Sequence, residues 1–180
     1  MNGFAITDHN SFEVFQNEEL EFQDMLIIKG MEIHTDHGDL IGLFLKKAIK
    51  SARFEEAIKE IRAQGGISVL PHPYRGHTDV EAIAQDVDAL EAFNCLTKHK
   101  ANRKAAELAR QLKKPVISSS DAHILGYIGA SYTIIEKPIR ENLLLGKTKV
   151  VSRYPGLGAR LANNVRQLKN IFRRKKIRHL

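Results

Sequence analysis

The stretch Gly65-Gly66-Ile67-Ser68-Val69-Leu70-Pro71-His72-Pro73 holds a short apolar run, bounded by glycine and proline, with a histidine directly after it. Such a run between turn residues predicts a buried strand over 67–70. The preceding residues, 54–64, carry apolar side chains at helical spacing, which predicts a helix that ends at the two glycines. A helix that leads into a buried strand is the repeating unit of an α/β fold.

The same alternation continues in both directions along the chain. Further strands are predicted at 4–6, 25–28, 31–33, 40–45, 89–93, 115–118 and 131–135, and further helices at 78–85 and 101–112. Ser51 is the expected cap of the helix at 54–64, and Thr78-Asp79-Val80-Glu81 is the expected capping box of the next helix. This spacing predicts one α/β domain with mostly parallel strands.

Composition sets limits on the class of protein. Hydrophobic residues make up 43% of the 180 residues, which is enough for a core and excludes a chain that is disordered throughout. The single cysteine, Cys95, excludes a disulfide framework and a cysteine-based zinc finger. The chain shows neither a signal-peptide pattern nor an apolar run long enough for a bilayer, so we expect a cytoplasmic protein.

Charge is distributed unevenly along the chain. Residues 1–141 hold 17 basic and 21 acidic residues, whereas residues 142–180 hold 11 basic residues and no acidic one. The pattern predicts a domain over 1–153 and a basic amphipathic tail over 154–180. This tail either packs on the domain or contacts an anionic membrane surface or nucleic acid through residues 157–178. One apolar helical face of the tail is formed by Leu157, Leu161, Val165, Leu168 and Phe172.

Side chains that can perform chemistry follow the predicted strands and are not scattered. In a parallel α/β barrel the carboxyl ends of the strands meet on one face, where active sites are built. Imidazoles and carboxylates suit zinc, manganese or iron, and paired ions clamp a phosphoryl group while generating hydroxide near neutral pH. The sequence therefore predicts a metal site formed by His9, Glu32, His72, Asp121 and His123.

In their order, these motifs resemble the PHP (polymerase and histidinol phosphatase) domain family. The resemblance covers roughly residues 1–150 and implies a distorted seven-stranded β/α barrel with phosphoesterase activity and two or three divalent ions, usually Zn, Mn or Fe. The motifs are Phe4-Ala5-Ile6-Thr7-Asp8-His9-Asn10, Gly30-Met31-Glu32, Pro71-His72-Pro73, Glu91-Ala92-Phe93-Asn94 and Ser120-Asp121-Ala122-His123.

The resemblance also implies roles for the metal ligands. Glu32 would bridge the first and second ions, His72 would bind the second, and Asp121 the first. His9 and His123 would bind a third ion.

Other polar residues near these motifs have candidate roles of their own. Arg75 is expected to bind a substrate phosphate, with a surface ion pair as the alternative. Asn94 is expected to hydrogen-bond the substrate or a ligand, with a structural role as the alternative. Asp8 is expected to orient its neighbours, and together with Arg75 and His123 it completes the set of candidate catalytic residues.

The sequence departs from the family pattern in two places. The family begins with a strand that carries His-x-His, and here the chain starts after that point, so we expect a barrel that lacks its first βα unit and binds metal less tightly. A misplaced start codon, a gene fragment or a truncation would each explain this. The second departure is Asp39, where the family often has histidine; strand register favours Asp39 as the ligand, whereas zinc chemistry favours His37.

The predicted function is hydrolysis of a phosphomonoester or related phosphate ester by metal-activated hydroxide. The substrate would be a small phosphorylated molecule. The alternative is a catalytically impaired PHP remnant that acts as a binding module through its basic tail, peripheral to the membrane or on nucleic acid. A barrel-type metal hydrolase acting on an amide is a third hypothesis.

Overall fold

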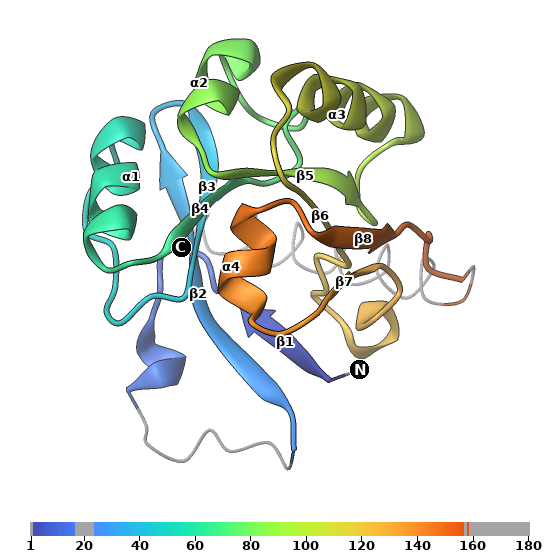
Figure 1. The fold of residues 1–180 in the computed structure, drawn as a ribbon, viewed down its shortest axis with the longest axis horizontal. Coiled ribbons are helices and arrows are strands. Elements are labelled where there is room, and N and C mark those ends of the chain that lie inside the picture. The colour runs from blue at the N-terminus through green and yellow to red at the C-terminus, as the bar shows by residue number, and fades with distance from the viewer. Residues whose placement is uncertain (1, 17–23, 157, 159–180) are drawn as a thin grey trace, which may run out of the picture.

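A computed structural model describes residues 2–16, 24–156 and 158, and Figure 1 shows a curled six-stranded sheet with strand order β1-β2-β3-β4-β5-β6 beside a two-stranded hairpin, β7-β8. The strands of the sheet are β1 (Gly3–Ile6), β2 (Leu26–Thr35), β3 (Gly38–Leu43), β4 (Ile67–Leu70), β5 (Ala89–Asn94) and β6 (Val116–Ser119). The hairpin consists of β7 (Tyr132–Ile135) and β8 (Thr148–Val151). The α-helices are α1 (Phe54–Ala63), α2 (Val80–Asp86), α3 (His99–Leu112) and α4 (Ile139–Leu144), and there are 3-10 turns at η1 (Glu13–Phe15) and η2 (Leu125–Tyr127).

Strand direction in the sheet is uniform except at β3. β1 is parallel to β2, and β4, β5 and β6 are parallel to one another, whereas β3 is antiparallel to both of its neighbours. The α/β class is therefore confirmed, and the seven-strand count of the predicted barrel stays a prediction. Because β3 is reversed, its first residues lie at the edge of the sheet where the other strands end.

β2 corrects the prediction of two short strands at 25–28 and 31–33. It is one strand whose first half pairs with β1 and whose second half pairs with β3. Gly30 lies at the change of partner, where a Cβ atom would come within 2.8 Å of the Gly42 carbonyl oxygen and 2.9 Å of Thr7 Cγ2. Only glycine permits this close approach, so the break seen in the sequence marks a crowded point within one strand.

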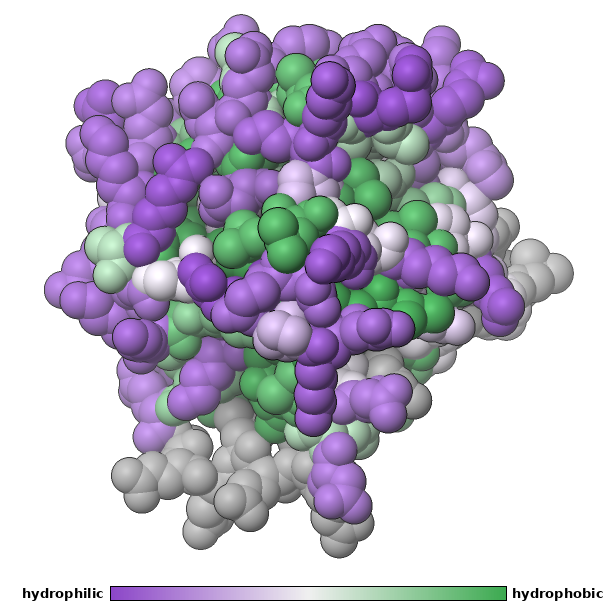
Figure 2. Space-filling view, in the orientation of Figure 1, coloured by the Kyte–Doolittle hydropathy of each residue, from purple (hydrophilic) through white to green (hydrophobic). Residues whose placement is uncertain are grey.

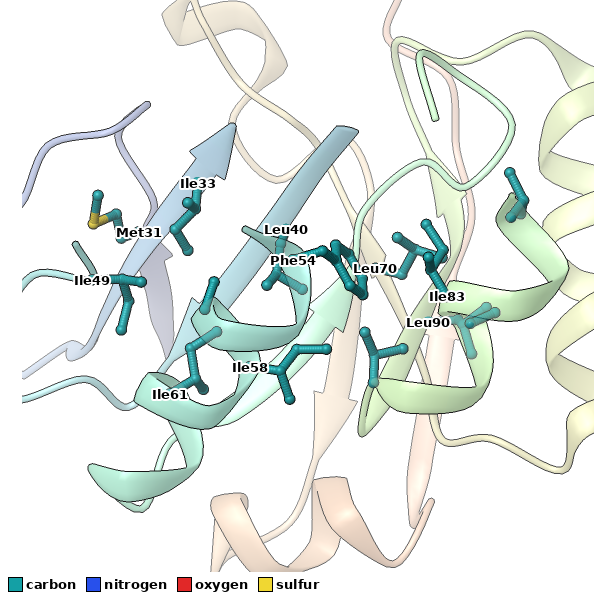
Figure 3. Packing of buried hydrophobic residues seen from close by; sticks show 14 of the residues in the cluster. Met31, Ile33, Leu40, Ile49, Phe54, Ile58, Ile61, Leu70, Ile83 and Leu90 are labelled. Atoms are coloured by element: carbon teal, nitrogen blue, oxygen red, sulfur yellow. The ribbon is translucent and has the colours of Figure 1, made fainter. Parts of the chain in front are cut away.

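The larger core lies between the sheet and helices α1 and α2 (Figure 3). The predicted apolar face of α1 is confirmed, because Phe54, Ala57, Ile58 and Ile61 are all buried. They pack with strand residues such as Leu40 into one cluster. Burial of apolar surface on this scale is the main stabilising contribution to the fold.

A smaller core lies against the other face of the sheet. Ile67 and Val69 of β4 pack with Leu143 of α4, while Leu70 of the same strand belongs to the larger core. Because side chains alternate along β4, the two faces of this strand pack into the two different cores. Helix α4 lies in front of the sheet in Figure 1 and was not predicted from the sequence, nor was β8.

The hairpin β7-β8 is joined to β6 by side-chain hydrogen bonds. Thr133 Oγ1 accepts the Ser118 N–H at 2.8 Å and donates to the Ser118 carbonyl oxygen at 2.9 Å. Thr148 Oγ1 donates to the Val116 carbonyl oxygen at 2.8 Å. These bonds satisfy backbone groups at the free edge of β6 without a continuous ladder.

The face seen in Figure 2 is largely hydrophilic, with small apolar areas, one of which lies over α4. Leu144 and Leu145, at the end of this helix, are 39% and 66% exposed. No helix in the described part of the chain is both long enough and apolar enough to cross a bilayer. The predicted tail helix falls almost wholly on residues 157–180, of which only residue 158 is described.

Both predicted helix caps are wrong. Ser51 Oγ accepts the N–H of Arg53, and α1 is capped instead by Asp36, whose Oδ1 accepts the Phe54 N–H at 2.8 Å. Asp79 precedes α2 in a left-handed conformation with φ of 51°, and no side chain caps that helix. A distant residue supplies the cap of α1, so the local sequence pattern was misleading.

The Asp36 cap predicts a pH-dependent contribution to stability. The hydrogen bond from the Phe54 N–H lowers the pKa of Asp36. A carboxyl group whose pKa is lower in the folded state stabilises the fold above its unfolded pKa, and this contribution is lost as the pH falls through the folded value. We expect Asp36→Asn to lower the unfolding temperature at pH 7 and to have progressively less effect below about pH 4. A difference that stays constant between pH 7 and pH 3 would contradict this.

Candidate metal centre

Three candidate ligands converge where β2, β3 and β4 meet. Glu32, Asp39 and His72 each offer one ligand atom, and these three atoms lie within 4.8 Å of one another. His72 Nε2 is 3.4 Å from Glu32 Oε1 and 4.0 Å from Asp39 Oδ2. Glu32 and His72 are buried, and Asp39 is half-buried. Two carboxylates and one imidazole at this separation fit a divalent ion such as zinc, manganese or iron.

The β2-β3 hairpin directs Asp39, and not His37, toward this site. Asp36 and His37 form the two-residue turn between the paired residues Thr35 and Gly38, so His37 does not belong to the strand. Its Nδ1 lies 3.2 Å from Thr78 Oγ1. Strand alternation therefore does not place His37, and of the two candidates left open by the sequence the geometry favours Asp39 as the ligand.

His72 lies in a tight turn that fixes its ring. Its φ is 31°, a left-handed value that is unusual for a residue with a side chain. Its carbonyl oxygen accepts the Arg75 N–H at 2.8 Å, and its Nδ1 lies 3.2 Å from the Arg75 carbonyl oxygen. The tautomer that satisfies this carbonyl carries the proton on Nδ1, which leaves Nε2 available as a ligand.

The acidic groups around His72 favour a cation at this position. Burial alone would lower the pKa of His72, but the hydrogen bond to Glu32 and the negative charges of Glu91 and Glu32 outweigh it and raise that pKa. The acidic surroundings thus favour positive charge at the ring. A metal ion would supply such charge by replacing the proton on Nε2.

His77 is a neighbour of the site to which the sequence assigned no role. Its Nε2 lies 2.8 Å from the Asp39 carbonyl oxygen, and its ring centroid lies 5.5 Å from that of His72. Burial lowers the pKa of His77, so the neutral ring is favoured beside His72. His77 lies five residues after His72, in the stretch Pro71-His72-Pro73-Tyr74-Arg75-Gly76-His77. This spacing matches neither helical nor strand periodicity, so the sequence did not indicate that His77 lies beside the site.

A second group of side chains joins the ends of β4, β5 and β6. Arg75 Nη2 lies 2.6 Å from Asp121 Oδ2, and Asn94 Nδ2 donates to the same oxygen at 3.1 Å. Burial would raise the pKa of Asp121, but the hydrogen bond and charge of Arg75 outweigh it and lower that pKa. The predicted phosphate-binding arginine is therefore paired with a predicted metal ligand.

His9 and His123 lie between these two groups. His9 Nε2 is 3.5 Å from Glu32 Oε2, and His123 Nδ1 is 3.5 Å from Asp121 Oδ1. Their ring centroids are 6.0 Å apart, and both rings are about half exposed, at 57% and 45%. Their positions allow either ring to face a ligand that enters from solvent.

Asp8 is the predicted site residue with the weakest structural link to the others. It is exposed, and its backbone carbonyl oxygen accepts the Glu32 N–H at 3.2 Å. This bond fixes the start of the His9 turn against β2. The geometry shows a backbone role for Asp8 and gives its carboxylate no described partner in residues 2–16 and 24–156.

Comparison with known proteins agrees with this arrangement. Residues 99–146 match the family model of PHP-associated sequences. The sheet is similar to that in the structure of a two-domain protein from Bacteroides vulgatus ATCC 8482 containing a predicted PHP-like metal-dependent phosphoesterase. The TM-score is 0.65 and the identity 17%, with 85% of this chain and 56% of that chain covered. The family-model match and the shared fold support the predicted resemblance to the PHP domain family.

Two uncharacterized proteins of Methanocaldococcus jannaschii are similar in sequence to this chain. MJ1587 is 38% identical over 96 residues, which cover 50% of this chain and 56% of the relative. MJ0417 is 32% identical over 151 residues, which cover 74% of this chain and 60% of the relative. The chain thus spans somewhat more than half the length of these curated relatives.

The candidate site also contains a buried acid whose role the sequence did not reveal. Glu91 is 2% exposed on β5, and burial raises its pKa. The available signal was a charged residue within the apolar run Ala89-Leu90-Glu91-Ala92-Phe93. A buried charge in such a run requires partners, and these partners prove to be site residues.

Proposed function

We propose that this chain is a metal-dependent phosphoesterase that hydrolyses a phosphomonoester or a related phosphate ester. The observation that carries the proposal is the convergence of Glu32 on β2, Asp39 on β3 and His72 after β4. Arg75, in the loop after β4, contacts Asn94 and Asp121 beside this group and would supply hydrogen-bond donors for an anion. A cation site next to anion donors is the combination that phosphate esters require.

One divalent ion, zinc, manganese or iron, would be held by Glu32, Asp39 and His72, at the position that the resemblance gives to the second ion. Asp121, with the bridging Glu32, would hold the first ion, and His9 and His123 would hold the third. Bound divalent ions supply a nucleophile at neutral pH and neutralise the phosphoryl oxygens. The acidic donors of this chain match that requirement in charge and in chemical type.

The remaining steps belong to the protein side chains. Arg75 would bind phosphoryl oxygens with the guanidinium N–H groups that do not donate to Asp121, Asn94 or Thr97. Asn94 would take the structural role, because both N–H groups of its Nδ2 already donate, to Glu91 and to Asp121. Asp8 would keep the His9 turn in place. The Asp121 carbonyl oxygen, 3.0 Å from His123 Nδ1, accepts the proton of that nitrogen. His123 Nε2 would therefore either bind an ion as a neutral ring or, as the imidazolium and without an ion, protonate the leaving oxygen.

Replacing Arg75 by glutamine is expected to weaken phosphate binding roughly tenfold to a hundredfold, because hydrogen bonds to charged groups contribute about 1.5–3 kcal/mol. The measurement is the inhibition constant of inorganic phosphate. Arg62→Gln is the matched control, since Arg62 pairs with Asp88 at 3.3 Å, at the opposite end of β5. Equal effects in the two variants would contradict the role of Arg75.

The substrate class is tested by the wild-type chain on a panel of phosphomonoesters, phosphodiesters and cyclic amides. With added Mn²⁺ or Zn²⁺ we expect release of inorganic phosphate from at least one monoester, and loss of that release with a chelator. Hydrolysis of the amides alone would replace the proposal with the amide-hydrolase hypothesis. Absence of any metal-dependent hydrolysis would favour the binding-module alternative.

Contact of residues 157–178 with an anionic membrane surface or nucleic acid remains a prediction, because nearly all of this segment lies outside the described residues. The cytoplasmic location and the domain boundary at 153 also remain predictions. Tyr154 contacts the body of the domain, since its hydroxyl donates to the Thr97 carbonyl oxygen at 3.2 Å.

A further inference from the structure

Glu91 connects three of the strand ends that carry the candidate centre. Its Oε2 accepts the His72 N–H at 2.6 Å and the Asn94 Nδ2–H at 3.0 Å, and its Oε1 accepts the Ser119 hydroxyl. These partners lie directly after β4, at the end of β5 and at the end of β6. Asn94 Nδ2 in turn donates to Asp121, so the connection extends to the second group of site residues.

We propose that Glu91 is the positioning residue of the metal centre: its carboxylate holds the His72 turn, Asn94 and the β6 end in one fixed arrangement. The inference rests on the proposed function, since it assigns a role toward the same ion. It goes beyond that function because Glu91 touches neither the ion nor the substrate. It acts through the residues that do.

The His72 backbone explains why such a restraint is needed. A side-chain-bearing residue with φ of 31° is costly unless the surrounding structure fixes it. Glu91 Oε2 accepts the backbone N–H of His72 at a distance typical of a strong hydrogen bond to a carboxylate. Without this acceptor the turn is free to relax, and His72 Nε2 would then move away from Glu32.

The hydrogen bonds of Glu91 show which substitutions separate a role through geometry from a role through charge. Glutamine at position 91 has the same length, and its amide oxygen can accept the two N–H groups while its NH₂ donates to Ser119 Oγ. Aspartate keeps the charge but is one methylene shorter, so it cannot reach the His72 N–H from β5. A positioning role therefore predicts that Glu91→Gln is tolerated and that Glu91→Asp is not.

The opposite end of the same strand pair offers a matched control. Asp88 Oδ2 accepts the Ser68 N–H at 2.8 Å and the Ser68 hydroxyl at 2.6 Å, so this carboxylate also ties β4 to β5. It does so at the start of both strands, away from the candidate ligands. Asp88→Ala should therefore reduce stability through the same kind of contact without changing the metal centre.

The experiment measures Mn²⁺ affinity by calorimetric titration and the unfolding temperature without metal, for the intact chain and each variant. We expect Glu91→Asp to weaken Mn²⁺ binding by about tenfold or more, the size found when residues supporting metal ligands are changed. Glu91→Gln should retain most of the affinity. Asp88→Ala should lower the unfolding temperature and bind Mn²⁺ like the wild type.

The inference is overturned if Glu91→Asp binds Mn²⁺ as the wild type does, or if Asp88→Ala weakens binding equally. Should Glu91→Asp fail to fold, Ser119→Ala takes its place, with a smaller loss in the same direction expected and no loss contradicting the inference. Failure of the proposed function gives a different result: the wild type itself binds no Mn²⁺, or His72→Ala binds it unchanged.

Discussion

His72→Ala should lower metal-dependent phosphate release by roughly two to three orders of magnitude, because loss of a ligand removes several kcal/mol of charge stabilisation and each 1.36 kcal/mol is a factor of ten. His72 is 4% exposed and its Nε2 points to both Glu32 and Asp39. The measurement is kcat/KM at saturating Mn²⁺.

A comparison of Asp39→Ala with His37→Ala accompanies this test. Asp39→Ala should reduce activity in the same way as His72→Ala, whereas His37→Ala should retain it, because the His37 ring faces Thr78 outside the ligand group. The reverse result, with His37 essential and Asp39 dispensable, would contradict the ligand set. Retention of full activity in His72→Ala would contradict the whole site.

Phe54→Ala is expected to cost about 3–5 kcal/mol in the free energy of unfolding, the usual range for removing a buried aromatic ring. Phe54 is 1% exposed at the start of α1 and packs in the same cluster as Leu40 and Leu70 (Figure 3). The cavity would lie between α1 and the sheet, where packed strands and helix leave little room for relaxation. Urea unfolding measures the change.

Leu145→Ala is the control for this stability prediction, because Leu145 is 66% exposed and its truncation leaves no buried cavity. We expect a change below about 0.5 kcal/mol for such a surface position. A loss of less than about 1 kcal/mol in Phe54→Ala, or equal losses in the two variants, would contradict the assignment of the larger core.

The elements predicted correctly are those whose apolar pattern is local. The run at 67–70 and the periodic face of 54–64 each bury a continuous set of side chains, and β4 and α1 form there. Helix α4 has six residues, too few to show helical periodicity, and β8 lies in a stretch rich in lysine. Both depend on packing against distant strands, which the local sequence does not encode.

The candidate site shows the same difference between features set by local sequence and features set by long-range contacts. The positions of His72 and Asp121 directly after strands could be predicted, because parallel strands bring their ends together. The Asp36 cap, the Arg75–Asp121 pair and the Glu91–His72 bond join residues between 18 and 46 positions apart. Such contacts depend on the curl and register of the sheet, so they could be found only from the structure.

Glu32, Asp39 and His72 are proposed to hold a divalent ion, and anomalous scattering at the manganese edge from crystals grown with Mn²⁺ would locate that ion. We expect an anomalous peak between these three side chains, within about 2–2.3 Å of a ligand atom from each. A peak elsewhere, or none at this position under conditions that support phosphate release, would contradict this assignment.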